Sequence, residues 1–207
     1  MSFLKNSTSF TRFKINEEAP ASLWPQILDK LRQYSFKDID DLPEERAWGW
    51  AAFEDMLDVE WKRVSPQKGG EYLAFTLRLE TRRVPAAVIK KHVGLALKKE
   101  EEQIRQQNKT FVSRERKKEI KELVLFQLNK RFLPIPAEFQ VIWNTQSGEI
   151  WFASTQAKIL DLFQEFFTLS FDLRLDQLTP YGLAADFLSE AETAKLDGLQ
   201  ATTFYKS

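Results

Sequence analysis

A run of fifty residues, 82–131, contains many more basic than acidic side chains. The run holds fifteen Lys and Arg and six Glu, a net charge of +9, whereas the rest of the 207-residue chain carries −9. A formal net charge of zero therefore hides a strongly polarised molecule. Such polarisation bears on what the protein binds more than on its fold.

Apolar residues recur at helical spacing at both ends of this run but are nearly missing from its middle. The helical spacing covers 88–97 and returns over 120–132. Between these segments the apolar residues are Ile104, Phe111 and Val112. Pro85 suits a first helical turn, and Ser113 is a candidate N-cap for a second helix. The pattern predicts two long helices over 84–132, folded back as a projecting hairpin whose roots pack on a core.

A polar, basic arm of this kind has little to bury, so we expect it to lie along something negative. Almost no aromatic residues stand among its charges, which favours contacts to the phosphates of a duplex over base stacking and predicts little sequence preference. A solvated hairpin with a charged surface is the other interpretation. The residues expected to contact DNA are Arg82, Arg83, Lys90, Lys91, Lys98, Lys99, Arg105, Lys109, Arg114, Arg116, Lys117, Lys118, Lys121, Lys130 and Arg131.

The three apolar residues in the middle of the run, Ile104, Phe111 and Val112, have two interpretations that stay open. Phe111 either closes the hairpin by packing on Ile104, or enters an apolar pocket on a second copy of the chain as an anchor ringed by charge. In the second case these three residues form a self-association site, and the protein is a homodimer.

The segments on either side of the arm have the patterning of an α+β body. Strands are expected at 9–15, 47–53, 71–83, 139–143, 149–153 and 169–175, and helices at 22–34, 154–168 and from 179. This order is β-α-β-β before the arm and β-β-α-β after it, so we expect one mixed or antiparallel sheet covered by helices. The body comprises 1–83 and 133–188, the arm is an insertion at 84–132, and 189–207 form a weakly ordered tail.

Motifs for catalysis are missing from the sequence. The chain has no cysteine and one histidine, His92, which lies on the apolar face of the first expected arm helix. It has no HExxH pair, phosphate loop or nucleophile elbow. The acids from Asp38 to Glu45 fit a solvated loop better than a metal site, and most of the six Trp occupy core positions of expected strands. We therefore expect no enzyme activity, no metal or other cofactor and no small-molecule substrate.

The sequence also limits where the protein is expected to work. No run approaches the roughly 18 apolar residues of a membrane span. The segment Met1–Phe10 lacks the apolar core of a secretory signal. Together with the absence of cysteine, these features predict a cytoplasmic protein without a membrane partner.

Several short segments resemble the recombination-associated protein RdgC family. They are Phe3-Leu4-Lys5-Asn6, Trp48-Gly49-Trp50, Val84-Pro85 followed by Val88-Ile89-Lys90, the charged helical pair, Lys130-Arg131-Phe132, and Val141-Ile142-Trp143 before a glycine hairpin. The resemblance runs from about residue 3 to about residue 180.

This resemblance implies a bacterial or phage DNA-binding protein of the nucleoid that restrains recombinase action without catalysis. It also implies a homodimer closed into a ring around duplex DNA, in which the arm meets the partner subunit. Family members continue beyond this length, so the resemblance implies a shortened relative. Two other functions stay open: a protein-interaction module whose basic arm docks an acidic partner or the chain's own acidic body, and a nuclease accessory subunit.

Overall fold

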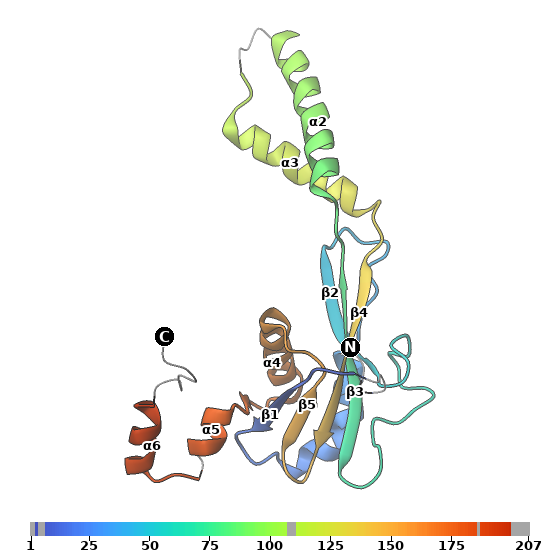
Figure 1. The fold of residues 1–207 in the computed structure, drawn as a ribbon. Coiled ribbons are helices and arrows are strands. Elements are labelled where there is room, and N and C mark those ends of the chain that lie inside the picture. Colours follow the sequence, from blue (N-terminus) through green and yellow to red (C-terminus); the bar gives the residue numbers. More distant parts are fainter. Residues whose placement is uncertain (1–2, 4–6, 107–110, 186, 200–207) are drawn as a thin grey trace.

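Six strands form one sheet in the order β2-β3-β4-β5-β1-β6, and every neighbouring pair is antiparallel (Figure 1). The strands are β1 (Thr11–Ile15), β2 (Arg46–Ala52), β3 (Tyr72–Thr81), β4 (Ile135–Asn144), β5 (Glu149–Phe152) and β6 (Leu175–Gln177). This computed structural model describes residues 3, 7–106, 111–185 and 187–199. The sheet is therefore antiparallel throughout its described strands, which is one of the two arrangements that the sequence allowed.

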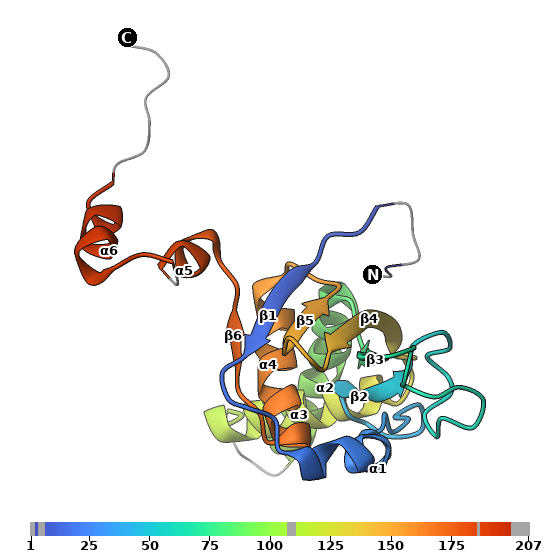
Figure 2. The same cartoon turned by 90° about the horizontal axis from the view of Figure 1, so that it is seen from below.

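The helices follow the predicted order along the chain, and α2 and α3 lie between β3 and β4. They are the 3₁₀ helix η1 (Ala21–Gln26), α1 (Ile27–Gln33), α2 (Ala86–Gln106), α3 (Arg114–Asn129), α4 (Ala157–Phe171), α5 (Pro180–Ala185) and α6 (Glu190–Asp197). Figure 2 shows α5 and α6 beyond the β6 edge of the sheet, on the side away from β2. No described helix has both the length and the apolar content that crossing a membrane would require.

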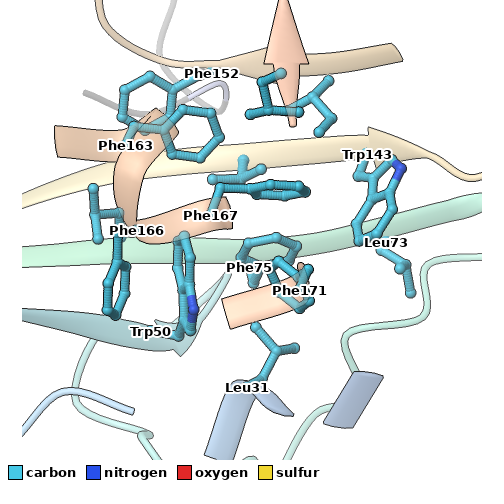
Figure 3. Packing of buried hydrophobic residues seen from close by; sticks show 14 of the residues in the cluster. Leu31, Trp50, Leu73, Phe75, Trp143, Phe152, Phe163, Phe166, Phe167 and Phe171 are labelled. Carbon is cyan, nitrogen blue, oxygen red and sulfur yellow. The ribbon is translucent and has the colours of Figure 1, made fainter. Parts of the chain in front are cut away.

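The core lies between one face of the sheet and α4, whose phenylalanines project to one side at helical spacing (Figure 3). Phe163 stacks on Phe152 of β5 with 3.9 Å between ring centres. Trp50 of β2 lies 4.8 Å from the ring of Phe166, and its indole Nε1 donates to Ser170 Oγ at 2.8 Å. One helix thus holds strands from both halves of the sequence.

The opposite face of β3 is also covered, although its residues are polar. Thr76, Arg78 and Glu80 are buried. Arg78 Nε donates to Glu80 Oε1 at 3.0 Å, Arg78 Nη1 donates to the Met56 carbonyl at 3.3 Å, and the guanidinium lies 4.1 Å from the ring centre of Phe36. The two faces alternate as predicted, and loops rather than solvent cover the polar one.

The prediction of a strand at 169–175 is wrong for most of these residues. Residues 169–171 form the last turn of α4, because Phe171 packs on the core aromatics that the rest of the helix contacts. Asp172 ends the helix in a left-handed conformation, φ 59°, and its N–H donates to the Thr168 carbonyl at 2.8 Å. The following strand, β6, begins only at Leu175.

The C-terminal segment contains a helix that we did not predict. α6 begins after Ser189, whose side chain and backbone exchange hydrogen bonds with Glu192 as a capping box. The last part of the expected tail, residues 200–207, lies outside the described residues.

Candidate nucleic-acid interface

The arm, residues 84–132, leaves the sheet from β3 and returns through β4 (Figure 1). These two strands are paired along their whole length, from Tyr72 opposite Asn144 to Thr81 opposite Ile135. The arm therefore begins and ends on neighbouring strands, and α2 and α3 lie beyond that end of the sheet.

The two arm helices are held by a small apolar cluster of their own. Ile120, Val124 and Leu128 recur at every fourth residue of α3 and are buried. They pack against half-buried residues of α2 and its flanks, which are Val84, Val88, Ile89, Val93, Ala96, Leu97 and Phe132. This cluster is separate from the main core, so the arm depends on far fewer buried contacts than the body does.

An ion pair joins the helices farther from the sheet. Arg116 of α3 donates from Nε to Glu100 Oε1 at 2.7 Å and from Nη2 to Glu100 Oε2 at 3.2 Å. Arg116 Nη1 also donates to Glu119 at 2.9 Å. The hydrogen bond from Arg116 lowers the pKa of Glu100, and both carboxylates raise the pKa of Arg116. Arg116 therefore already pairs with two carboxylates of the arm itself.

Thirteen of the fifteen predicted cations lie exposed on the arm and its root. Two of these thirteen have a carboxylate partner, Arg116 and Lys118, the latter 3.7 Å from Glu122. The Lys130 ammonium lies 4.8 Å from the ring centre of Phe126. Within the described part of the chain, the other eleven exposed cations have no carboxylate partner. Lys109 lies outside the described residues.

Arg82 is the one described cation of the predicted set that is not exposed, and the structure removes it from the expected DNA contacts. Its side chain is buried, and its guanidinium donates only to backbone carbonyls. The acceptors are Phe132 at 2.7 Å, Glu44 at 2.9 Å, Ile39 at 2.6 Å, Asp40 at 2.8 Å and Leu42. Five acceptors match the five N–H donors of a guanidinium. Arg82 thus fastens the acidic loop of the body and the end of the arm to β3.

Two hollows flank the root of the arm. The larger, of about 770 Å³, brings Arg83 and Lys90 together with Lys121 of α3 over an apolar floor that includes Ile89. The smaller, of about 210 Å³, gathers Lys99 and Arg131 beside the half-buried His92. Cations from both helices therefore meet on two sides of the arm, a grouping that sequence spacing alone did not predict.

The three predicted self-association residues occupy different environments. Val112 is buried within the chain, so the prediction of an intermolecular role for it is wrong in this structure. Ile104 is half-buried, whereas Phe111 is 78% exposed. The exposure of Phe111 counts against the interpretation that it closes the arm by packing on Ile104. Leu123 and Phe126 of α3 are also exposed, and we did not single them out.

The described residues contain no group of three or more His, Cys, Asp and Glu placed to hold a metal ion. Of the loop acids that we weighed as metal ligands, Asp40 and Glu44 accept hydrogen bonds from the Arg82 guanidinium through their backbone carbonyls. Trp50, Trp61 and Trp143 are buried, as expected for core residues.

A family model described as "Putative exonuclease, RdgC" matches residues 3–188 of the 207. The match covers the sheet, the arm and α5. No curated protein matches the chain.

Replacing Arg82 should destabilise the protein, because it removes a buried side chain that donates to five backbone carbonyls. We expect Arg82→Gln to lower the free energy of unfolding by about 3 kcal/mol or more, measured by urea denaturation. Arg83→Gln is the matched control at an exposed neighbour and should change it by less than about 0.5 kcal/mol. Unchanged stability in Arg82→Gln would contradict the role assigned to this side chain.

Proposed function

The chain belongs to the RdgC family, and from that premise we propose that it is a recombination-associated protein that binds duplex DNA through the arm, without catalysis. The observation that carries the proposal is the set of eleven exposed cations on the arm that have no carboxylate partner among the described residues. The acidic body supports it, because a neutral chain that separates its charges this strongly directs one end toward an anion.

Contacts to phosphates account better for this surface than base readout does. The exposed cations lie on both helices and around the root, where Lys90 and Lys121 share one hollow. Few aromatic side chains accompany them, so sequence-tolerant stacking has little support. A surface of this composition positions a protein on the DNA backbone and carries little sequence information. Occupation of a duplex in this way would restrain a recombinase that needs the same DNA.

We also propose that the working form is a homodimer with Phe111 as an anchor. An aromatic side chain that is 78% exposed among charges gains about 1.5–3 kcal/mol when a partner covers it. Leu123 and Phe126 add exposed apolar surface on the same arm. A second copy that covers Phe111 would place two basic arms on one DNA molecule, and avidity would then strengthen binding.

Reversing the charge of the arm should abolish DNA binding without unfolding the protein. We expect Lys98, Lys99, Lys117 and Lys118 changed together to Glu to remove the gel shift of a duplex. For the unmodified protein, neutralising about six phosphates predicts a slope of log K against log salt of about −5. A flat salt response would favour the alternative in which the arm docks on protein.

The matched control reverses four exposed cations of the body, Lys14, Lys37, Lys158 and Arg174, by the same substitution. This variant has the same net charge and should retain most of the affinity. Equal loss in both variants would mean that net charge, rather than the arm, governs binding.

We propose that the protein does not cut DNA, although the family description contains the word exonuclease. Purified protein with magnesium or manganese should leave end-labelled duplex and single-stranded DNA intact on a denaturing gel. Cleavage that follows the protein through purification, and disappears when Asp38, Asp40, Asp41, Glu44 and Glu45 are replaced, would overturn this part of the proposal.

The dimer predicts that Phe111→Ala keeps the fold but weakens self-association. Helix content by circular dichroism should be unchanged, while the dimer fraction in sedimentation and the DNA affinity fall. Phe187→Ala is the control, because Phe187 is 88% exposed in the C-terminal segment and should alter neither quantity. A protein that is monomeric at every concentration, with and without DNA, would exclude the anchor.

A further inference from the structure

The outer edge of β2 is only partly covered. β2 is the first strand of the sheet, so one of its sides has no neighbouring strand. At Trp50 that side is covered: the Trp50 N–H donates to the Tyr34 carbonyl at 2.9 Å, and the Phe36 N–H donates to the Trp50 carbonyl at 3.0 Å. Ala52, two residues further along β2, also has a partner on this side, because its N–H donates to the Asp58 carbonyl at 2.9 Å.

The other end of the same edge is open. On the β3 side, the Glu45 carbonyl accepts from the Arg82 N–H at 2.8 Å, so alternate residues from 45 onward turn their backbone groups toward β3. Arg46 and Trp48 therefore turn their N–H and C=O groups outward, as Trp50 does. Within the described part of the chain, neither residue has a backbone partner on the outer side.

The segment that covers the edge at Trp50 lies very close to β2. The segment that covers it approaches so closely that a Cβ on Gly49 would lie 2.3 Å from Phe36 Cα. Only glycine permits this contact. Beyond it, the chain turns into the acidic loop that Arg82 holds, and among the described residues this loop makes no backbone hydrogen bond with Arg46 or Trp48.

A groove of about 370 Å³ lies beside the open edge. Trp48 projects on the same sheet face as Trp50 and is 41% exposed, and Leu42 is 47% exposed. The apolar residues that line the groove are Tyr34, Ile39, Leu42, Ala47, Trp48 and Phe166. A single bulky apolar side chain, carried on the strand that would pair with β2, fits such a hollow.

The loop beside the groove carries a net negative charge. Residues 37–46 hold five acids and two cations, a net charge of −3. Asp38 and Glu44 line the groove itself, together with Lys37 and Arg46. No ion pair involves any of these charges within the described residues. The groove lining itself carries two acids and two cations, so a ligand with Lys or Arg at its ends complements the acidic loop as a whole.

We propose that the β2 edge at Arg46–Trp48 binds an extended segment of a partner protein, which pairs as an added strand, places an apolar side chain beside Trp48 and carries flanking Lys or Arg. Unpaired strand groups select an extended chain over a helix, because a helix has already used its own N–H and C=O groups. A second copy bound through the same edge would bring two acidic loops together, which like-charge repulsion disfavours. The site is separate from the arm.

The test uses a fluorescein-labelled peptide, acetyl-Lys-Val-Thr-Phe-Thr-Val-Lys-amide, and fluorescence anisotropy with the full chain. Its control peptides replace the central Phe with Ala, replace both Lys with Glu, or are N-methylated at alternate residues in the two complementary patterns. We expect the Ala and Glu peptides to bind at least about tenfold more weakly. One N-methylated isomer should lose binding and the other keep it, because only one set of N–H groups faces the strand.

The matched protein variants are Arg46→Pro and Arg46→Ala. Proline removes an N–H that points away from β3, so the sheet keeps its hydrogen bonds while the edge is blocked. We expect Arg46→Pro to weaken binding more than about tenfold and Arg46→Ala less than about threefold. Trp48→Ala should weaken it about tenfold or more, as removal of an anchor does. DNA affinity should be unchanged in all three variants.

Several results would overturn the site. They are no binding by the unmodified protein, equal binding of both N-methylated isomers, and an Arg46→Pro variant that binds normally. A change in solution mass for Arg46→Pro would mean that the edge joins two copies, which also contradicts the proposal. The arm variant with four reversed charges should bind the peptide as the unmodified protein does, so failure of the DNA proposal and failure of this site are distinguishable.

Discussion

The guanidinium of Arg82 joins three parts of the molecule that are distant in sequence. Among the described residues it has no carboxylate partner, and it donates to backbone carbonyls of the loop at 39–44 and of Phe132. A buried cation without its acceptors would be costly, so the loop and the end of α3 are held where the guanidinium needs them. The direction in which the arm leaves the sheet depends on this one side chain together with the pairing of β3 and β4.

The same fixed loop shapes the surface of the body. Residues 39–44, held by Arg82, line the groove beside Arg46 and Trp48, but within the described residues they make no backbone hydrogen bond with the outer side of either one. The interaction that anchors the basic arm therefore also holds the loop that lines the groove beside the β2 edge. The two surfaces proposed to bind partners are thus separate in position and linked through one structural element.

Sequence patterns predicted the helices and strands that have strong periodicity. They failed where tertiary contacts determine burial or secondary structure. The helical spacing of Ile120, Val124 and Leu128 located the root of the arm, and the alternation in β3 located its central strand. Arg82 could not be separated from its neighbour Arg83 by composition, since burial depends on carbonyls brought from 40–50 residues away. The segment ending at Phe171 fits a period of two as well as a helix, and packing against α4's other aromatics decided it.

Other features differ in how far local sequence could have predicted them. The capping box of Ser189 and Glu192 was readable and would have predicted α6. The exposure of Phe111 and the burial of Val112 were not readable, because adjacent apolar residues on a charged segment carry no periodicity. The open end of β2 depends on strand order, which local sequence does not contain.

The arm's separate cluster of buried residues has a consequence for how the protein unfolds. Ile120, Val124 and Leu128 share no buried contact with the aromatic core under α4, so the arm can lose its packing while the sheet keeps its own. Regions with few buried apolar contacts open at lower free energy than the global transition. The arm is then a cooperative unit of its own, with amide protons that exchange faster than those of β3, and any ligand that orders it contributes folding energy to that unit alone.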